Sequence, residues 1–549
     1  MTTTNDLADD LLALQMAAEP LGATLLGIPG HDEDLADPSA AADERTRAAA
    51  LRIAERADAL VEAGDDPLTA KVVAQQARAA VDRIDARMVE YTITDLFVGP
   101  ASSLLSYLPM LPVPDAERAR AYVSRLRKVP AHLAAVAERH RAGVAAGRVP
   151  VRRLVDAAIA HLDRYLATDL DADPLLAHPL ADDLAAVADE RRAVVRDEVR
   201  PAFAEYRRVL AEEIAGHGRP DSAPGLCHLP GGAEAYAALS RVHTTTAKTP
   251  DELHQAGLDI IAALRAEYAE LGARVFGTDD LAEVFAHLQD DQDLRWRDED
   301  ELLAAARTAV RRAEEAAPGW FGRLPSQPCE VRPVPAAEAP GAPPAYYMQP
   351  SLDGLRPGVY YANTHGVTER QRFIAETMAF HEAVPGHHFQ LTLAQELDEL
   401  HLVRRLADVN AYAEGWGLYT ERLADEMGLY SSDTTRFGML AMDSMRAGRL
   451  VVDTGLHAKG WSREQAIDYL RENTPMSALE ITTEVDRYIA YPAQALSYMV
   501  GRLELQRLRA EAQQRLGDAF DIKAFHDLVL CNGPLPMTVL DELVTAWAA

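Results

Sequence analysis

Three histidines and one glutamate lie within eight consecutive residues: His381, Glu382, His387 and His388. Neutral imidazole is the commonest protein ligand for a transition metal, and a glutamate directly after the first histidine can serve as a general base. In the standard His-Glu-x-x-His pattern the two histidines stand four residues apart and share one helix face. Here Pro385 occupies that fourth position, so the pattern is a variant of the standard one.

The spacing of the histidines does not suit a straight helix. His387 follows His381 by six residues and His388 follows it by seven. Six helical residues rotate by about 600°, which leaves His387 about 120° from the face of His381, and seven rise by about 10.5 Å. Proline lacks an N–H and clashes with the preceding turn, and glycine tolerates unusual backbone angles. We therefore expect Pro385 and Gly386 to break the helix and to bring His387 to the metal, with His388 as the alternative.

A third ligand is expected from a second helix. A catalytic zinc needs three protein ligands and one open position for water, and Glu414, in the segment from Asn410 to Glu421, fits the third place. Small residues flank it at Ala413, Gly415 and Gly417, which permits a close approach of two helices. Glu421 lies seven residues further on the same face. We expect it either to orient a ligand histidine or to form a surface salt bridge.

Charged residues also recur on one face of a later helix. They are spaced three, four and four residues apart: Arg446, Arg449, Asp453 and His457. The neighbouring side chains are apolar, so we expect a buried network that lines a cleft. We expect Asp453 to contact the metal-binding residues and to help orient them.

A polar and aromatic segment follows between residues 484 and 498. Hydrolysis of an amide builds negative charge on a tetrahedral oxygen, which a tyrosine hydroxyl, a histidine or an arginine can stabilise. The candidates are Tyr488, Tyr498 and Arg487, with His457 behind them. The alternatives are that both tyrosines pack in the core and that Arg487 grips a substrate carboxylate.

Composition narrows the class of protein. The chain has 549 residues with 85 acidic against 55 basic side chains, and this balance argues against a nucleic-acid surface. Three scattered cysteines do not make a disulfide framework. The first twenty residues lack the features of a signal peptide, and no segment approaches the roughly 18 apolar residues of a membrane span. We expect a cytoplasmic protein that binds neither nucleic acid nor membrane.

The chain as a whole reads as mainly helical. The region 216–232 is rich in glycine and proline and is the best candidate for a boundary between two subdomains. We therefore expect an N-terminal helical subdomain, 1–225, and a catalytic subdomain, 226–549. Two short runs, 329–334 and 358–363, are typical of strands. This small β element stands just before the metal motif, where a sheet edge could pair with an extended substrate.

Four motifs carry a resemblance to a known family. They are His-Glu-x-x-Pro-Gly-His-His-x-Gln, Glu-Gly-Trp-x-Leu-Tyr-x-Glu, Val-Asp-Thr-Gly-x-His and Arg-Tyr-x-x-x-Pro-x-Gln-Ala-x-Ser-Tyr. Together they resemble the bacterial family known as domain of unknown function 885, and the similarity extends from Gly27 to Pro536. The resemblance implies a gluzincin-like metallopeptidase with a large helical, zincin-like fold and a deep cleft, similar to the M3 and M32 peptidases. It implies metal binding by His381, His387 or His388, and Glu414, and base chemistry by Glu382.

The sequence therefore predicts a zinc-dependent hydrolase of an amide or peptide bond, with one Zn²⁺ per chain and Mn²⁺ or Co²⁺ as substitutes. Its partner would be a peptide or small amide substrate. One alternative is a metalloenzyme of the same fold diverted to a small-molecule amide, or to a lyase or hydrolase reaction, in specialised metabolism. The other is a non-catalytic helical binding protein that retains a metal site.

Overall fold

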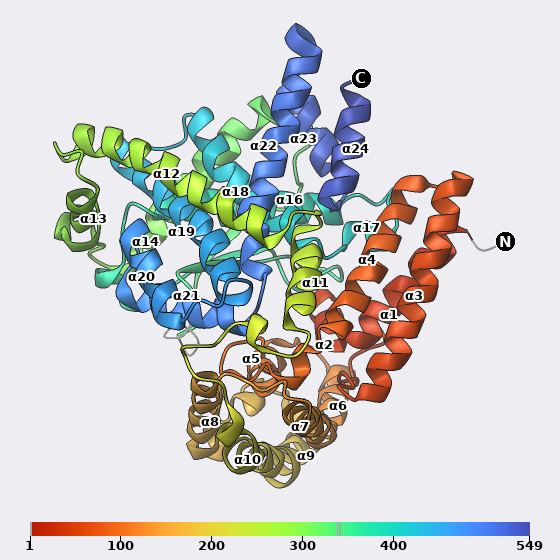
Figure 1. The fold of residues 1–549 in the computed structure, drawn as a ribbon. Coiled ribbons are helices and arrows are strands. Elements are labelled where there is room, and N and C mark those ends of the chain that lie inside the picture. Colours follow the sequence, from red (N-terminus) through yellow and green to blue (C-terminus); the bar gives the residue numbers. More distant parts are fainter. Residues whose placement is uncertain (1–2, 337–338, 340–341) are drawn as a thin grey trace. The chain divides into compact units, whose positions relative to one another are not determined.

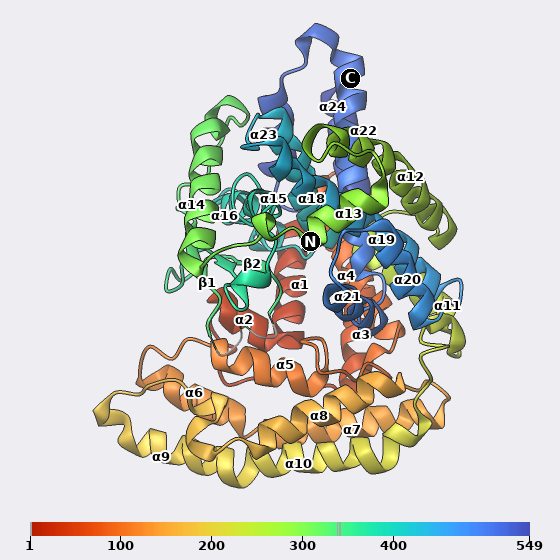
Figure 2. The same ribbon diagram turned by 90° about the vertical axis from the view of Figure 1, so that its left-hand side faces the viewer.

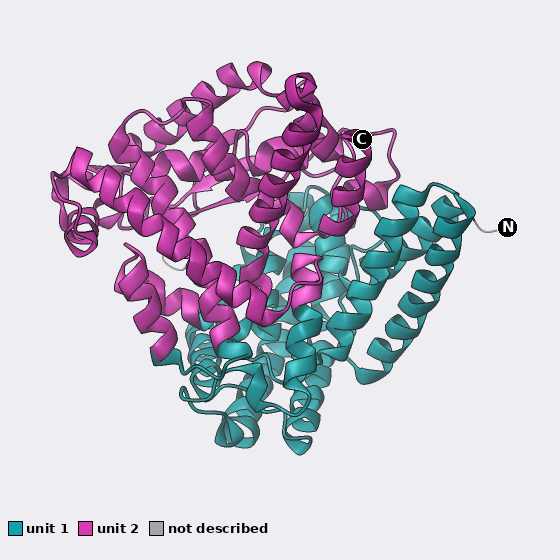
Figure 3. Ribbon diagram, turned by 45° about the horizontal axis from the view of Figure 1, so that its top comes forward, with its two compact units in different colours: residues 1–239, 456–464, 486–492 teal, residues 240–455, 465–485, 493–549 magenta. Residues whose placement is uncertain are grey.

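The structure is a computed structural model that describes residues 3–336, 339 and 342–549. It is mainly helical with one small three-stranded sheet, as the sequence predicts (Figure 1). The chain forms two compact units (Figure 3). Unit 1 consists of residues 1–239, 456–464 and 486–492, and unit 2 consists of residues 240–455, 465–485 and 493–549.

The first division of the chain falls after residue 239 rather than after residue 225, and two later segments return to unit 1. The hydrogen bonds give the physical reason. The N–H of Leu226 donates to Nδ1 of His457 (3.1 Å), and Nε2–H of His457 donates to the carbonyl of Tyr488 (3.0 Å). Segments far apart in sequence therefore build unit 1 together.

Unit 1 is built from helices only. Their bounds are α1 (Thr4–Ala18), α2 (Pro20–Leu26), α3 (Ala40–Ala63), α4 (Pro67–Asp85), α5 (Pro100–Tyr107), α6 (Ala116–Leu126), α7 (Val129–Ala145), α8 (Arg152–Ala167), α9 (Ala185–Val194), α10 (Arg200–Val209) and most of α11 (Gly232–Thr244). Helices α7, α8 and α10 lie side by side (Figure 2). Apolar side chains such as Val155, Leu162 and Phe203 fill the core between them.

Unit 2 contains the remaining helices and the sheet. The helices are α12 (Pro250–Val275), α13 (Leu281–Asp290), α14 (Glu299–Ala316), α15 (Ala375–Glu382), α16 (His387–Gln395), α17 (Leu402–Arg405), α18 (Asn410–Glu426), α19 (Asp433–His457), α20 (Arg463–Asn473), α21 (Ala478–Ala490), α22 (Ser497–Leu516), α23 (Ile522–Leu530) and α24 (Met537–Trp547). The last residues of α19 and α21 and the start of α20 belong to unit 1. In the described residues, no helix has the length and apolar character needed to cross a membrane.

Local sequence signals explain several helix starts. Ser39 accepts the N–H of Ala42 and so caps α3, as its place after Asp37 and Pro38 indicates. Thr249 and Glu252 exchange hydrogen bonds at the start of α12 with Pro250 in the first turn, which is a capping box.

The sheet consists of β1 (Glu330–Pro333), β3 (Val359–Ala362) and β2 (Ala345–Met348) in that order. Strand β1 is parallel to the central β3, with Val331 opposite Tyr360, and β2 is antiparallel to it, with Ala345 opposite Ala362. The sequence predicted β1 and β3. It missed β2, a four-residue strand between prolines with no alternation of polar and apolar side chains.

Candidate metal centre

The predicted break in the metal motif is present. Helix α15 ends at Glu382 and α16 begins at His387. A Cβ on Gly386 would lie 1.9 Å from the carbonyl oxygen of His381, so only glycine fits this turn. The indole N–H of Trp416 donates to the carbonyl of Pro385 (2.8 Å) and fixes the turn against α18.

The break brings three predicted ligands together. One ligand atom each from His381, His387 and Glu414 lies within 4.8 Å of the others. Oε2 of Glu414 is 3.3 Å from Nε2 of His387 and 3.7 Å from Nε2 of His381. Ligands bonded to zinc at about 2.1 Å in a tetrahedron lie roughly 3.4 Å from one another. The spacing and the donor types of this set therefore fit a zinc ion.

Exposure of the three side chains rises from 3% for His381 to 12% for His387 and 22% for Glu414. The centre is therefore closed on the side of the first histidine and partly open on the side of the glutamate. A catalytic metal needs such an arrangement, since a water molecule or substrate must reach its open position.

His388 faces away from this set. Its Nε2–H donates to the carbonyl of Gln327 (2.9 Å), and its Nδ1 lies 2.9 Å from the hydroxyl of Tyr347 and 3.3 Å from that of Thr392. Both ring nitrogens therefore have partners outside the metal centre. The geometry favours His387 over His388 as the ligand, in agreement with the sequence preference.

Glu421 is fully buried and contacts the first histidine. Its Oε1 lies 2.8 Å from Nδ1 of His381, and Nδ1–H is the donor. This bond fixes the tautomer that leaves Nε2 of His381 free to bind a metal. Burial alone would lower the pKa of His381, but hydrogen bonds to Glu414 and Glu421 raise it to about 9. The position of Glu421 is that of an orienting residue and not that of a surface ion pair.

Small residues let α18 approach its neighbours. A Cβ on Gly415 would lie 2.4 Å from Cα of Gly501 in α22, and a Cβ on Gly417 would lie 2.7 Å from Cε1 of His381. The hydroxyl of Thr420 donates to the carbonyl of Phe380 (3.2 Å). Gly417 and Thr420 thus let α18, which carries Glu414 and Glu421, lie close to α15, while Gly415 lets it lie close to α22.

Glu382 occupies the last position of α15 and is 7% exposed. Within the described part of the chain its carboxylate has no hydrogen bond or ion pair. Burial, and then the negative charge of Glu382, raises the pKa of Tyr360 in β3. The carboxylate directly after the first candidate ligand is therefore not engaged by another described residue.

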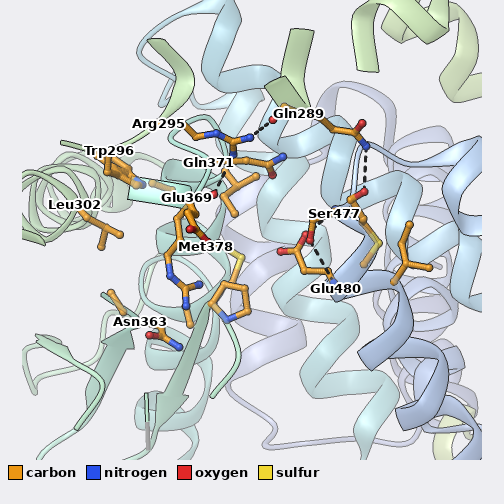
Figure 4. A pocket seen from close by; sticks show the side chains of 18 of the residues that line it. Gln289, Arg295, Trp296, Leu302, Asn363, Glu369, Gln371, Met378, Ser477 and Glu480 are labelled. Atoms are coloured by element: carbon orange, nitrogen blue, oxygen red, sulfur yellow. Dashed lines mark hydrogen bonds between the residues drawn. The ribbon is translucent and has the colours of Figure 1, made fainter. Parts of the chain in front are cut away.

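A pocket of about 470 Å³ lies along α15 (Figure 4). Met378 of α15 and Ile374, directly before this helix, line it, together with Tyr360 of β3 and Trp296. Residues four apart share a helix face, so Glu382 lies on the same face of α15 as Met378, but neither Glu382 nor the candidate metal ligands are among the residues that line the pocket.

The charged face of α19 is buried, as expected, but its members have separate partners. Arg449 pairs with Glu484 (2.9 Å), and the guanidinium groups of Arg446 and Arg449 lie 5.6 Å and 4.4 Å from the ring centre of Tyr498. The carboxylate of Asp453 accepts the N–H of Ala493 (3.1 Å), a residue with a φ of 68°. Asp453 therefore supports the strained turn before α22.

Three residues that the sequence offered for stabilising the oxyanion belong to unit 1: His457, Arg487 and Tyr488. The candidate metal ligands belong to unit 2. Both ring nitrogens of His457 bind backbone groups, and burial lowers its pKa to about 4. Its ring has no nitrogen left for a substrate. Tyr488 is fully buried, and the guanidinium of Arg487 lies 5.1 Å from its ring centre.

Sequence reasoning missed several residues that support the centre. Tyr347 bonds His388, Trp416 fixes the turn, and the hydroxyl of Tyr430 donates to the carbonyl of Glu421 (3.1 Å). The motif around Glu414 contained Trp416, and an indole flanked by two glycines was a signal of a close helix contact. No local pattern pointed to Tyr347 or Tyr430.

Comparisons with solved structures support the fold. The protein described as "the putative lipoprotein from Colwellia psychrerythraea" matches over 100% of both chains, with 28% identity and a TM-score of 0.90. A second, described as "a putative lipoprotein of unknown function from Shewanella oneidensis", matches 99% of this chain and 100% of its own, with 19% identity and a TM-score of 0.76. A comparison with curated proteins finds no match.

The family comparison agrees with the motifs quoted above. The family described as "Bacterial protein of unknown function (DUF885)" matches residues 20–544, which include His381, His387, Glu414 and Glu421. Since the match covers nearly the whole chain, the protein belongs to the DUF885 family.

Proposed function

We propose that this protein is a zinc-dependent hydrolase that cleaves an amide or peptide bond. One observation carries the proposal: His381, His387 and Glu414 converge on one point, and the free carboxylate of Glu382 directly follows the first of them. Two imidazoles and a carboxylate are a ligand set typical of catalytic zinc. We include in the proposal a gluzincin-like ancestry and a substrate cleft similar to those of the M3 and M32 peptidases.

Each residue of the centre has a defined task in this proposal. When bound, zinc supplies a Lewis acid that favours ionisation of water and polarises a carbonyl. Glu382 takes the proton from the attacking water and passes it to the nitrogen of the leaving amine, while the water oxygen bonds to the carbonyl carbon and the C–N bond breaks. Glu421 holds His381 in the ligating tautomer.

The residue that stabilises the oxyanion also belongs to the proposal. Tyr498 lies in unit 2, is partly exposed and begins the helix that packs against α18, so it suits the role better than the fully buried Tyr488. Loss of such a donor lowers kcat by roughly 10²–10³-fold with little change in KM.

Two alternatives and the localisation stay predictions. One alternative is a metalloenzyme of the same fold that acts on a small-molecule amide or carries out a lyase or hydrolase reaction in specialised metabolism. The alternative of a non-catalytic binding protein gains no support from the free Glu382. The cytoplasmic localisation rests on the sequence, and the similar Colwellia protein is described as a "putative lipoprotein".

The experiment that tests the proposal is digestion of a library of peptides and small acylated amines by the zinc-loaded protein. The matched control is Glu382→Gln, which keeps the shape of the side chain and removes its basicity. We expect the variant to retain metal and fold and to lose roughly 10²–10⁴-fold in turnover. Near-normal turnover by the metal-loaded variant would show that Glu382 is not the base.

A further inference from the structure

Arg446 is a buried arginine that has no oxygen partner among the residues that the structure describes. It is 5% exposed, its Nη1 faces the sulfur atoms of Met442 (2.7 Å) and Met445 (4.0 Å), and its guanidinium lies 5.6 Å from the ring centre of Tyr498. Its Nε is buried and has no acceptor. Among the described residues, no carboxylate oxygen lies within 4 Å of its nitrogens.

Other buried arginines of this chain have oxygen acceptors for their guanidinium groups. On the same helix face, Arg449 pairs with Glu484, and Arg502 of α22 pairs with Asp443. Arg219, which has no carboxylate partner in the described part of the chain, donates to two backbone carbonyls at 3.0 and 3.1 Å. Oxygen acceptors thus accompany these buried guanidinium groups, whereas thioethers and an aromatic ring surround that of Arg446.

The buried charge of Arg446 reduces the stability of the fold unless a ligand supplies a partner for it. A guanidinium group does not deprotonate in proteins, and a buried charge without a partner destabilises the fold. An aromatic face and thioether sulfur compensate only in part. A carboxylate would match the two parallel N–H donors of the fork and would supply the missing charge.

Helix α22 carries the stacking partner of Arg446 and packs against α18, the helix that carries Glu414. This stacking partner, Tyr498, stands three residues before Gly501, so the two share one face of α22. Gly501 touches α18 at Ala411 and Gly415, directly beside Glu414. Tyr498 and Gly501 are thus about one helical turn, or roughly 5 Å, apart along α22.

We propose that Arg446, held against the ring of Tyr498, binds a carboxylate of the substrate, so that the hydrolase acts on molecules with a free carboxylate near the cleaved amide bond. This inference rests on the proposed function for its placement in catalysis. Arg446 would then bind the substrate carboxylate, a role for which the sequence had suggested Arg487. Arg449, on the same ring, is already neutralised by Glu484.

The first test compares matched peptides that end in a free carboxylate or in an amide. We expect kcat/KM to be about 10–100-fold higher for the free acids, as is usual for a hydrogen-bonded charge pair. The variant Arg446→Met should lose this preference through a higher KM for the acids, and Arg446→Lys, which keeps the charge without the fork, should keep part of it. The control is Arg311→Met, at an exposed position.

A second comparison identifies which carboxylate is bound. Peptides with Asp or Asn beside the cleaved bond, each with an amidated end, separate a side-chain carboxylate from a terminal one. Equal hydrolysis of acids and amides by the unmodified protein would overturn the inference and leave the proposed hydrolase intact. An equal loss on both kinds of substrate in Arg446→Met would also overturn it, because a carboxylate site acts on the acids alone.

The third test does not depend on turnover. The melting temperature of the purified protein is measured with a mixture of the twenty N-acetyl-L-amino acids and with a mixture of their amides. We expect the acids alone to raise it, and Arg446→Met to abolish the rise without lowering the melting temperature of the free protein. Absence of any shift with the acids would overturn the inference whatever the metal content, and a shift without hydrolysis of any peptide would count against the proposed function only.

Discussion

Replacement of Gly386 by alanine should destroy the metal centre without touching a ligand. The added Cβ would lie 1.9 Å from the carbonyl oxygen of His381 and 2.4 Å from that of Phe380. Ordinary carbon–oxygen contacts begin near 3.4 Å, so the turn must open by roughly 1–1.5 Å. Metal sites tolerate deviations of about 0.2 Å. His387, which directly follows the turn, would therefore move out of range of the other two ligands.

The size of the expected loss in zinc affinity and in stability follows from this displacement. A misplaced ligand should lower the zinc affinity by at least 10–100-fold, the range found when a supporting group is removed. Overpacking at a buried turn should also reduce the free energy of unfolding by about 1–3 kcal/mol. Competition with a chelator measures the affinity, and urea unfolding measures the stability.

Gly22 provides the matched control. It lies in the short helix α2, and the nearest atom to an added Cβ is 4.0 Å away. Gly22→Ala should leave zinc binding unchanged and should raise the stability by up to about 1 kcal/mol, because alanine has the higher helix propensity. Zinc binding of unchanged affinity in Gly386→Ala would refute the reasoning about the turn.

Two further predictions concern the buried groups. Glu421→Ala should lower the zinc affinity about 10–100-fold, since Nδ1 of His381 loses its acceptor, and an unchanged dissociation constant would show that the residue does not orient the ligand. Burial lowers the pKa of three histidines to about 4: His140, His457 and His526. Between pH 6.5 and 4 the unfolded chain therefore binds more protons than the folded chain. The free energy of unfolding should then decrease as the pH is lowered, by up to about 1.4 kcal/mol per pH unit for each histidine. Urea midpoints that do not change between pH 7 and 5 would contradict this.

The sequence was informative where local chemistry decides the structure. Proline and glycine at 385–386 predicted the helix break, because their backbone restrictions act within one turn. The capping residues Ser39 and Thr249 likewise predicted where their helices begin. The ligand set His381, His387 and Glu414 followed from residue types that suit zinc, and the structure brings these residues together.

Contacts between distant segments could not be predicted in the same way. Glu421 stands 40 residues from His381, and its role depends on how α18 packs against α15. His457 shares a helix face with Arg446 and Arg449, but its ring is used by the backbone of Leu226 and Tyr488, which the spacing along one helix does not reveal. The missing acid partner of Arg446 is also visible only in three dimensions.

The most direct test of the central claim is the zinc content of the purified protein and of single ligand variants, measured by elemental analysis after exposure to zinc. We expect about one zinc per chain in the unmodified protein and in His388→Ala, and almost none in His381→Ala, His387→Ala and Glu414→Ala. A protein that takes up no zinc, cobalt or manganese, or a His387→Ala variant that keeps its metal while His388→Ala loses it, would contradict the assignment of the site.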